Sequence, residues 1–190
     1  VLIVGGLDVS QLCKPVVGER LGRRLREGWA DDLGVQVSFV PVANPDGVAL
    51  DRRANARGVD LNRNFPADNF AADNGGGPRP LSEPESRALH DLIVDTPPRA
   101  IITLHCCEPM FDWDGPAEPL ARAMAAAMPD EMAFPVDRLG GSPGSLGSWA
   151  GADLGIPVVT VEFDWHHTTP VSQQYPAVER ALDAGLRHLA

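Results

Sequence analysis

Several polar side chains in this sequence directly follow apolar runs and could bind a metal ion or move a proton. Carboxylate, imidazole and amide oxygen groups can all ligate a metal ion, and a carboxylate or imidazole can also accept a proton from water. In sheets of α/β proteins, ligands bind outside the carboxyl ends of the strands, so side chains at those ends are brought together. This convergence predicts an enzyme. The positions concerned are Asp8 and Gln11, the segment 43–80, His105 and Glu162.

Apolar runs alternate with amphipathic segments along the chain, which is typical of an α/β protein. Segment 43–80 is rich in Asn, Asp, Gly and Pro, and a compact domain rarely keeps so long an irregular stretch unless it is functional. Ser82 and Glu85, with Pro84 between them, predict a capping box at a helix start. We expect a three-layer α/β sandwich with a central mixed, largely parallel sheet, folded as a single domain over residues 1–190. Strands are expected at 1–4, 35–42, 100–104 and 157–163, and helices at 12–27, 82–94, 119–128 and 172–189.

The composition narrows the class of partner. The 190 residues are 44% hydrophobic and 22% charged, with a net charge of -10, which argues against nucleic acid and against an anionic membrane surface. No apolar run reaches the roughly 20 residues that span a bilayer, and no leader sequence is visible. Three cysteines, with Cys106 and Cys107 adjacent, do not form a disulfide framework, so we expect reduced thiols and a cytoplasmic location. The apolar start at residue 1 leaves a longer native N-terminus open.

Residues 44–66, NPDGVALDRRANARGVDLNRNFP, resemble a hallmark of the zinc carboxypeptidases. The resemblance continues in order through PLSEPESRAL, IITLHC and GSPGSLGSWAGADLGIPVVTVEF, and so spans nearly the whole chain. Within that family it is most similar to the bacterial murein peptide amidase branch. The resemblance implies the zinc-carboxypeptidase fold, of the phosphorylase/hydrolase-like type. It also implies hydrolysis of an amide bond in a peptide with a free carboxylate, with a cell-wall peptide as the implied substrate.

The resemblance assigns a role to each matching position. Peptide hydrolysis needs a nucleophilic water, a base that takes its proton and a cation facing the oxyanion. The planar fork of arginine also suits a carboxylate, because it binds both oxygens. By position, the resemblance implies a zinc ligand at His105, a general base at Glu162, an oxyanion-stabilising arginine at Arg53, a carboxylate-gripping pair at Asn62 and Arg63, and at Asp60 a carboxylate that orients a histidine ligand. Asn55 and Asn64 are expected to hold the loop through side-chain-to-backbone hydrogen bonds.

The first zinc motif departs from the family's pattern. The family carries H-x-x-E after a Gly-Gly turn, whereas this chain has Asp8 and Gln11 at those two places. An aspartate oxygen lies as many bonds from Cα as the ligating histidine nitrogen, and the formal charge of the ligand set is preserved. We therefore expect Asp8, Gln11 and His105 to hold zinc, with weaker binding, another divalent metal or no metal as open alternatives. With Asp8 facing Asp60, one carboxylate must be protonated, or neutralised by a metal or an arginine.

These residues leave three alternative hypotheses for the function. A metal-dependent peptidase is the main hypothesis, because a mere binder has no need of the base at Glu162 or of Arg53. A non-catalytic peptide-binding relative that has lost zinc is favoured by the change at Asp8 and Gln11. A zinc deacylase of the succinylglutamate desuccinylase/aspartoacylase type fits the motifs less well. The family's catalytic-loop tyrosine has no match, because the single tyrosine, Tyr175, lies beyond Glu162, and His166 and His167 are expected at the cleft rim.

Overall fold

The protein is described by a computed structural model over residues 1–7, 16–164 and 170–190. The predictions made for Asp8, Gln11, His166 and His167 fall outside the described residues.

Six strands form one mixed sheet in the order β2-β1-β3-β6-β4-β5. Every neighbouring pair is parallel except β4 and β6, which are antiparallel. The predicted mixed, largely parallel sheet is therefore confirmed. The strands are β1 (Leu2–Gly5), β2 (Ser38–Val40), β3 (Ile101–Cys107), β4 (Met110–Asp114), β5 (Val136–Asp137) and β6 (Val158–Asp164).

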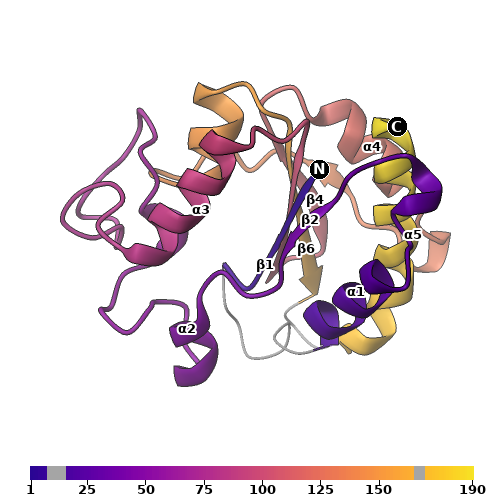
Figure 1. Ribbon diagram of the computed structural model, residues 1–190, viewed down its shortest axis with the longest axis horizontal. Helices are drawn as coiled ribbons and strands as arrows, with labels where there is room; N and C mark the ends of the chain where they lie inside the picture. The colour runs from indigo at the N-terminus through magenta and orange to yellow at the C-terminus, as the bar shows by residue number, and fades with distance from the viewer. Residues whose placement is uncertain (8–15, 165–169) are drawn as a thin grey trace.

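Helices cover both faces of the sheet and complete the predicted three layers (Figure 1). One face packs against α1, α4 and α5, while α3 and a π-helix cover the other. The α-helices are α1 (Val16–Arg26), α2 (Pro45–Leu50), α3 (Pro84–Asp95), α4 (Glu118–Ala125) and α5 (Val171–Leu189), the π-helix is η4 (Gly147–Asp153), and short 3-10 helices are η1 (Asp31–Leu33), η2 (Leu61–Arg63) and η3 (Asp130–Met132).

The alternation of side chains along β3 and β6 decides which layer holds the candidate site. Ile102 and Val159 belong to the apolar cluster beneath α4 and α5, whereas Ile101 and Val158 belong to the cluster beneath α3 and the π-helix. Because successive strand residues point to opposite faces, side chains an even number of positions beyond Ile101 and Val158 face the α3 layer. His105 and Glu162 lie at such positions and face that layer.

The structure corrects several sequence-based expectations about the elements. Strand β3 does not end before His105 but runs through it to Cys107, and strands β4 and β5 were not predicted. The capping box at Ser82 is also wrong, because Glu83 occupies the N-cap position of α3 and makes no side-chain capping bond. The Ser82 hydroxyl instead donates to Glu83 Oε1 (2.8 Å) and accepts from Asn64 Nδ2 (2.9 Å).

The cysteine prediction is wrong for Cys106, which is disulfide-bonded. Disulfides persist mainly in oxidising compartments, so the cytoplasmic prediction loses the support of reduced thiols. Within the described part of the chain, no helix has the length and apolar content needed to cross a membrane.

Candidate active site

The predicted catalytic and substrate-binding side chains line one polar cavity of about 200 Å³. Segment 43–80 contributes three of these side chains, and strands β3 and β6 contribute one each. The cavity therefore joins residues that lie more than 100 positions apart in the sequence. The predicted residues that line it are Arg53, Asn62, Arg63, His105 and Glu162.

Segment 43–80 is held to the sheet at its start by Asn44. Its backbone N–H donates to Gly6 O (2.8 Å), just beyond the end of β1. The buried Asn44 side chain caps α2 by accepting from Gly47 N (2.8 Å) and donates from Nδ2 to Arg53 O (2.9 Å). The N-P-D-G motif thus builds a short capped helix and fixes the backbone of Arg53 beside it.

Two further buried asparagines brace the segment, as the sequence predicted. Asn55 Oδ1 accepts from Arg57 N (3.0 Å) and Val59 N (3.1 Å), which closes a tight turn. Its Nδ2 donates to Glu83 Oε2 (2.8 Å) at the start of α3. Burial acts to raise the pKa of Glu83, but the hydrogen bonds from Asn55 and Ser82, together with the positive charges of Arg57 and Arg87, leave this pKa lowered.

Asn64 ties the turn that carries Asn62 and Arg63 to the start of α3. Its Nδ2 lies within hydrogen-bond distance of Gly76 O, Arg79 O and Ser82 Oγ, at 2.5–3.0 Å. Its Oδ1 accepts from Glu83 N (3.1 Å) and Ser86 Oγ (2.5 Å). We call residues 44–86, which these asparagines brace, the grip segment.

Two glycines allow other loops to pack against the backbone of Arg63. A Cβ added at Gly76 or at Gly144 would collide with the Arg63 carbonyl group, and Gly144 also has a positive φ of 68°. Only glycine fits such a close approach without displacing the carbonyl. The Arg63 guanidinium is held by the preceding residue, because its Nη1 donates to Asn62 O (2.7 Å).

The side-chain amide of Asn62 is oriented by the loop before the π-helix. Leu146 N donates to Asn62 Oδ1 (3.0 Å), so this oxygen is already used. The amide nitrogen, which can only donate, is then the part of the side chain left for a ligand. An amide donor beside the guanidinium of Arg63 suits a carboxylate.

Asp60 bridges the two halves of the grip segment. Its Oδ1 accepts from Asn62 N (2.9 Å), which caps the 3-10 turn η2, and its Oδ2 accepts from Arg53 Nε (2.6 Å). Asp60 is therefore paired with an arginine, which is one of the ways of neutralising this carboxylate that the sequence allowed. The ion pair aligns the side chain of Arg53, which is 46% exposed.

His105 and Glu162 lie side by side on neighbouring strands. They are direct partners in the parallel β3–β6 ladder, and His105 Nδ1 is 3.5 Å from Glu162 Oε1. Both side chains are buried, at 4% and 7% exposure. Among the described residues, Glu162 Oε2 has no hydrogen-bond partner, although it is buried. A buried carboxylate oxygen without a partner is costly unless it serves a ligand or a reaction.

Two acidic residues of β4 also line the cavity, and sequence reasoning missed both. Asp112 and Asp114 are two positions apart and therefore face the same side of the sheet. Burial raises the pKa of Asp112, and Glu162 raises it further. Burial together with Asp112 raises the pKa of Asp114 to about 6. The alternation in MFDWD could have revealed a strand, but aspartate is depleted from strands and masked it.

We call the sheet-borne side chains of the cavity the cavity floor. They come from three adjacent strands and face the α3 layer. The cavity floor consists of Thr103, His105, Asp112, Asp114, Thr160 and Glu162.

The described residues supply part of a metal site. Across residues 1–7, 16–164 and 170–190, no three His, Cys, Asp or Glu side chains are arranged to hold a metal ion. His105 offers an imidazole nitrogen next to a buried carboxylate, which fits zinc, but catalytic zinc takes three protein ligands. The other two predicted ligands, Asp8 and Gln11, fall in the part of the chain that is not described.

Tyr175 does not belong to the cavity. It lies on α5, 1% exposed, within the apolar cluster on the opposite face of the sheet. Burial raises its pKa to about 12, so it stays protonated there. The absence of a match for the family's tyrosine in the sequence is thus consistent with where Tyr175 lies.

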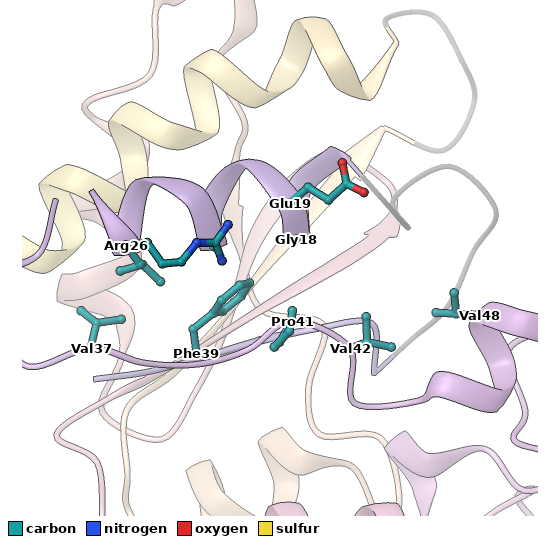
Figure 2. A pocket seen from close by; sticks show the side chains of 10 residues that line it. Gly18, Glu19, Arg26, Val37, Phe39, Pro41, Val42 and Val48 are labelled. Carbon is teal, nitrogen blue, oxygen red and sulfur yellow. The ribbon is translucent and has the colours of Figure 1, made fainter. Parts of the chain in front are cut away.

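A larger groove of about 780 Å³ lies between α1 and β2 (Figure 2). Its lining is mainly apolar, with Val37, Phe39, Pro41 and Val42 along the β2 side. None of the predicted catalytic or substrate-binding residues lines it. Its greater volume therefore does not make it the reactive site.

Comparison with known proteins agrees with this geometry. The sequence profile of the zinc carboxypeptidase family matches residues 34–119. Murein peptide amidase A of Escherichia coli strain K12 is 35% identical over 153 residues, which cover 70% of this chain and 60% of that protein. The Vibrio campbellii murein peptide amidase A is 32% identical over 159 residues, or 74% of this chain and 59% of that protein. The chain thus spans about 60% of the length of these curated relatives.

Solved structures share the fold. The murein-tripeptide amidase of Escherichia coli O157 superimposes with a TM-score of 0.66 at 29% identity, covering 98% of this chain and 80% of that one. Bovine thrombin-activatable fibrinolysis inhibitor gives a TM-score of 0.80 at 20% identity, covering 100% and 81% of the two chains. The second likeness concerns the fold alone.

Proposed function

The chain belongs to the zinc carboxypeptidase family, and from this premise we propose that it is a metal-dependent peptidase. Its substrate is a peptide with a free carboxylate near the scissile amide bond, and a cell-wall peptide is the specific candidate. One observation carries the proposal. Arg53, Asn62 and Arg63 from the grip segment share one cavity with His105 and Glu162 from the sheet.

The grip segment binds the substrate carboxylate in this proposal. The Asn62 amide nitrogen donates one hydrogen bond, and Arg63 supplies the positive charge and the planar fork. Because Leu146 N and the Asn62 carbonyl already hold these two side chains, little side-chain entropy is lost on binding.

The chemistry takes place between Glu162 and Arg53. Glu162 acts as general base, and its buried Oε2 accepts the proton of the attacking water. Arg53, aligned by Asp60, faces the oxygen of the scissile carbonyl as negative charge develops on it. Glu162 then carries the proton that the leaving amine needs.

Zinc is the proposed cofactor, held by Asp8, Gln11 and His105. When bound, it would lower the pKa of water and polarise the carbonyl. The buried imidazole of His105 beside the Glu162 carboxylate supports this assignment on the described side of the site.

Metal analysis and hydrolysis of a murein tripeptide test the proposal together. Protein purified without a chelator or a metal-affinity resin should carry one divalent ion per chain, and His105→Ala should lose it. A matched control, His90→Ala on α3, should keep the ion, because His90 stacks on Trp149 outside the cavity. Hydrolysis that is unchanged in His105→Ala would contradict the proposal.

A peptide binder without catalysis is the second candidate. The observation that favours it is the replacement of two ligand positions by Asp8 and Gln11. In that case the chain would bind the tripeptide without a stoichiometric ion, and Arg63→Ala would weaken binding while no product formed.

A further inference from the structure

A glycine-rich loop forms one wall of the cavity that Asn62 and Arg63 also line. We call residues 140–148, GGSPGSLGS, the wall loop, and it leads into the π-helix η4. Glycine has more backbone freedom than any other residue, so the wall loop depends on contacts to fix where it lies. The residues of the wall loop that line the cavity are Gly140, Ser142, Ser145, Leu146 and Gly147.

The wall loop contacts both members of the carboxylate-binding pair. Leu146 N donates to Asn62 Oδ1 (3.0 Å) and so leaves the amide nitrogen of Asn62 for a ligand. Gly144 packs against the carbonyl of Arg63, and its own carbonyl oxygen accepts from Phe65 N (2.9 Å). Because hydrogen bonds weaken steeply with poor geometry, the place of the wall loop sets the orientation of the Asn62 amide.

Asn69 ties the wall loop to the grip segment at three points. Its Nδ2 donates to Gly141 O (3.2 Å) and to Ser148 Oγ (3.1 Å), and its Oδ1 accepts from Gly144 N (3.1 Å). One side chain of the grip segment therefore reaches the start, the middle and the end of the wall loop.

Serine side chains hold the wall loop together from within. Ser148 Oγ donates to Ser142 O (2.8 Å) and accepts from Ser145 Oγ (3.1 Å), while Ser148 N donates to Ser145 Oγ (3.0 Å). These bonds keep the shape of the wall loop, but they do not fix its position relative to Asn62. That position depends on bonds to the grip segment, and Asn69 supplies three of them.

Asn69 itself is exposed and does not line the cavity. It therefore does not contact a ligand in the cavity, and its influence on binding passes through the wall loop. Because water can replace the hydrogen bonds of an exposed amide, loss of this side chain should displace the wall loop more than it destabilises the fold.

We propose that Asn69 is a positioning residue for the carboxylate-binding pair. Through the wall loop it holds Leu146 N in the place where that group orients the Asn62 amide. The inference rests on the proposed function for the nature of the ligand, a peptide carboxylate. It assigns Asn69 to substrate binding and not to the proton transfer at Glu162.

Binding of a murein tripeptide with its terminal carboxylate free or converted to an amide tests this role. Calorimetric titration of the Glu162→Gln protein measures binding without hydrolysis. The free form should bind at least about tenfold more tightly, since hydrogen bonds to charged groups contribute on that scale. Asn69→Ala should lower this ratio about fivefold by weakening binding of the free form alone. With Glu162 intact, the same change should raise KM for the free form about fivefold and leave kcat within about twofold.

Asn74→Ala is the matched control, because Asn74 is exposed in the same segment. Its backbone N–H donates to Ala71 O (3.2 Å), but among the described residues its side chain makes no hydrogen bond and does not line the cavity. This control should keep the full ratio. In an Asn62→Ala background, Asn69→Ala should change the ratio by less than about twofold, because the group that it positions is gone. Thermal unfolding of each variant shows that it is folded.

The outcomes separate this inference from the proposed function. Equal binding of the free and amidated peptides by protein with Asn69 intact would contradict the proposed carboxylate grip, and the positioning role with it. A strong preference for the free form that survives Asn69→Ala would overturn the positioning role alone. A loss on Asn69→Ala that is equally large without the Asn62 side chain would also overturn it, because Asn69 would then act by another route.

Discussion

The grip segment and the cavity floor treat buried polar groups in opposite ways. In the grip segment, the buried asparagines donate to and accept from several backbone and side-chain groups each. In the cavity floor, Asp114 and Glu162 each keep a buried oxygen without a partner among the described residues. Because unpartnered buried acceptors are costly, the asparagines of the grip segment stabilise the fold around its binding residues, whereas the carboxylates of the cavity floor are placed for a ligand or a reaction.

The largest expected effect comes from the cavity floor. Glu162→Gln should reduce hydrolysis of a murein tripeptide by roughly 10²- to 10⁴-fold, because the general base is lost. The melting temperature should not fall, since the substitution removes a buried charge and keeps the shape. Steady-state kinetics beside thermal unfolding check both parts, with the surface variant Glu118→Gln as the control. Retained activity would refute the role of Glu162.

The next largest effect is a loss of stability expected from a substitution in the grip segment. Asn64→Ala should lower the free energy of unfolding by about 3 kcal/mol, because it leaves several buried donors and acceptors without partners. Asn69→Ala is the control, because Asn69 also bonds to neighbouring loops but is exposed, and its loss should cost less than about 1 kcal/mol. Chemical denaturation measures both. A smaller loss for Asn64 than for Asn69 would break the contrast between the regions.

Asp114→Asn should raise the free energy of unfolding, whereas Asn64→Ala should lower it. The raised pKa of Asp114, about 6 against an ordinary 3.8, means that the folded chain binds the proton more tightly than the unfolded chain. Wild-type stability therefore falls as pH rises from about 4 to 6. The variant lacks this titration and should be more stable than wild type above pH 6, by on the order of 2–3 kcal/mol. Equal pH profiles of the two proteins would contradict this.

The smallest effects on stability and activity are expected for Asp60, which links the two halves of the grip segment. Asp60→Asn keeps an acceptor for Asn62 N but removes the charge facing Arg53. Arg53 is half exposed, so stability should change by less than about 1 kcal/mol. Misalignment of Arg53 should lower kcat roughly tenfold with little change in KM, since its contact forms as the oxyanion develops. A change in KM alone would assign Asp60 to substrate binding instead.

The two regions also differed in how well the sequence predicted them. Asn62, Arg63 and the bracing Asn64 stand in an uninterrupted motif, so their positions could be assigned by resemblance. Asp112 and Asp114 carry no motif, and their strand looks unlike a strand because acidic residues are depleted there. Only the antiparallel return of β4 beside β6 brings them under Glu162.

The helices and strands also differed in how well the sequence predicted them. The buried strands β1, β3 and β6 were predicted because their cores are continuous apolar runs. Helix α2 and the turn η2 are too short to show a helical period, so they were missed within segment 43–80. Ser82 fits a capping box locally, but its hydroxyl serves Asn64 and Glu83 instead, a tertiary contact that no local pattern contains.

The most direct test of the account compares one peptide in two forms, with its terminal carboxylate free or converted to an amide. If the grip segment binds the carboxylate while the cavity floor carries out the reaction, zinc-supplied protein should hydrolyse the free form at least about 100-fold faster, measured as kcat/KM. Equal hydrolysis of the two forms, or hydrolysis of neither by protein with a stoichiometric ion, would contradict it.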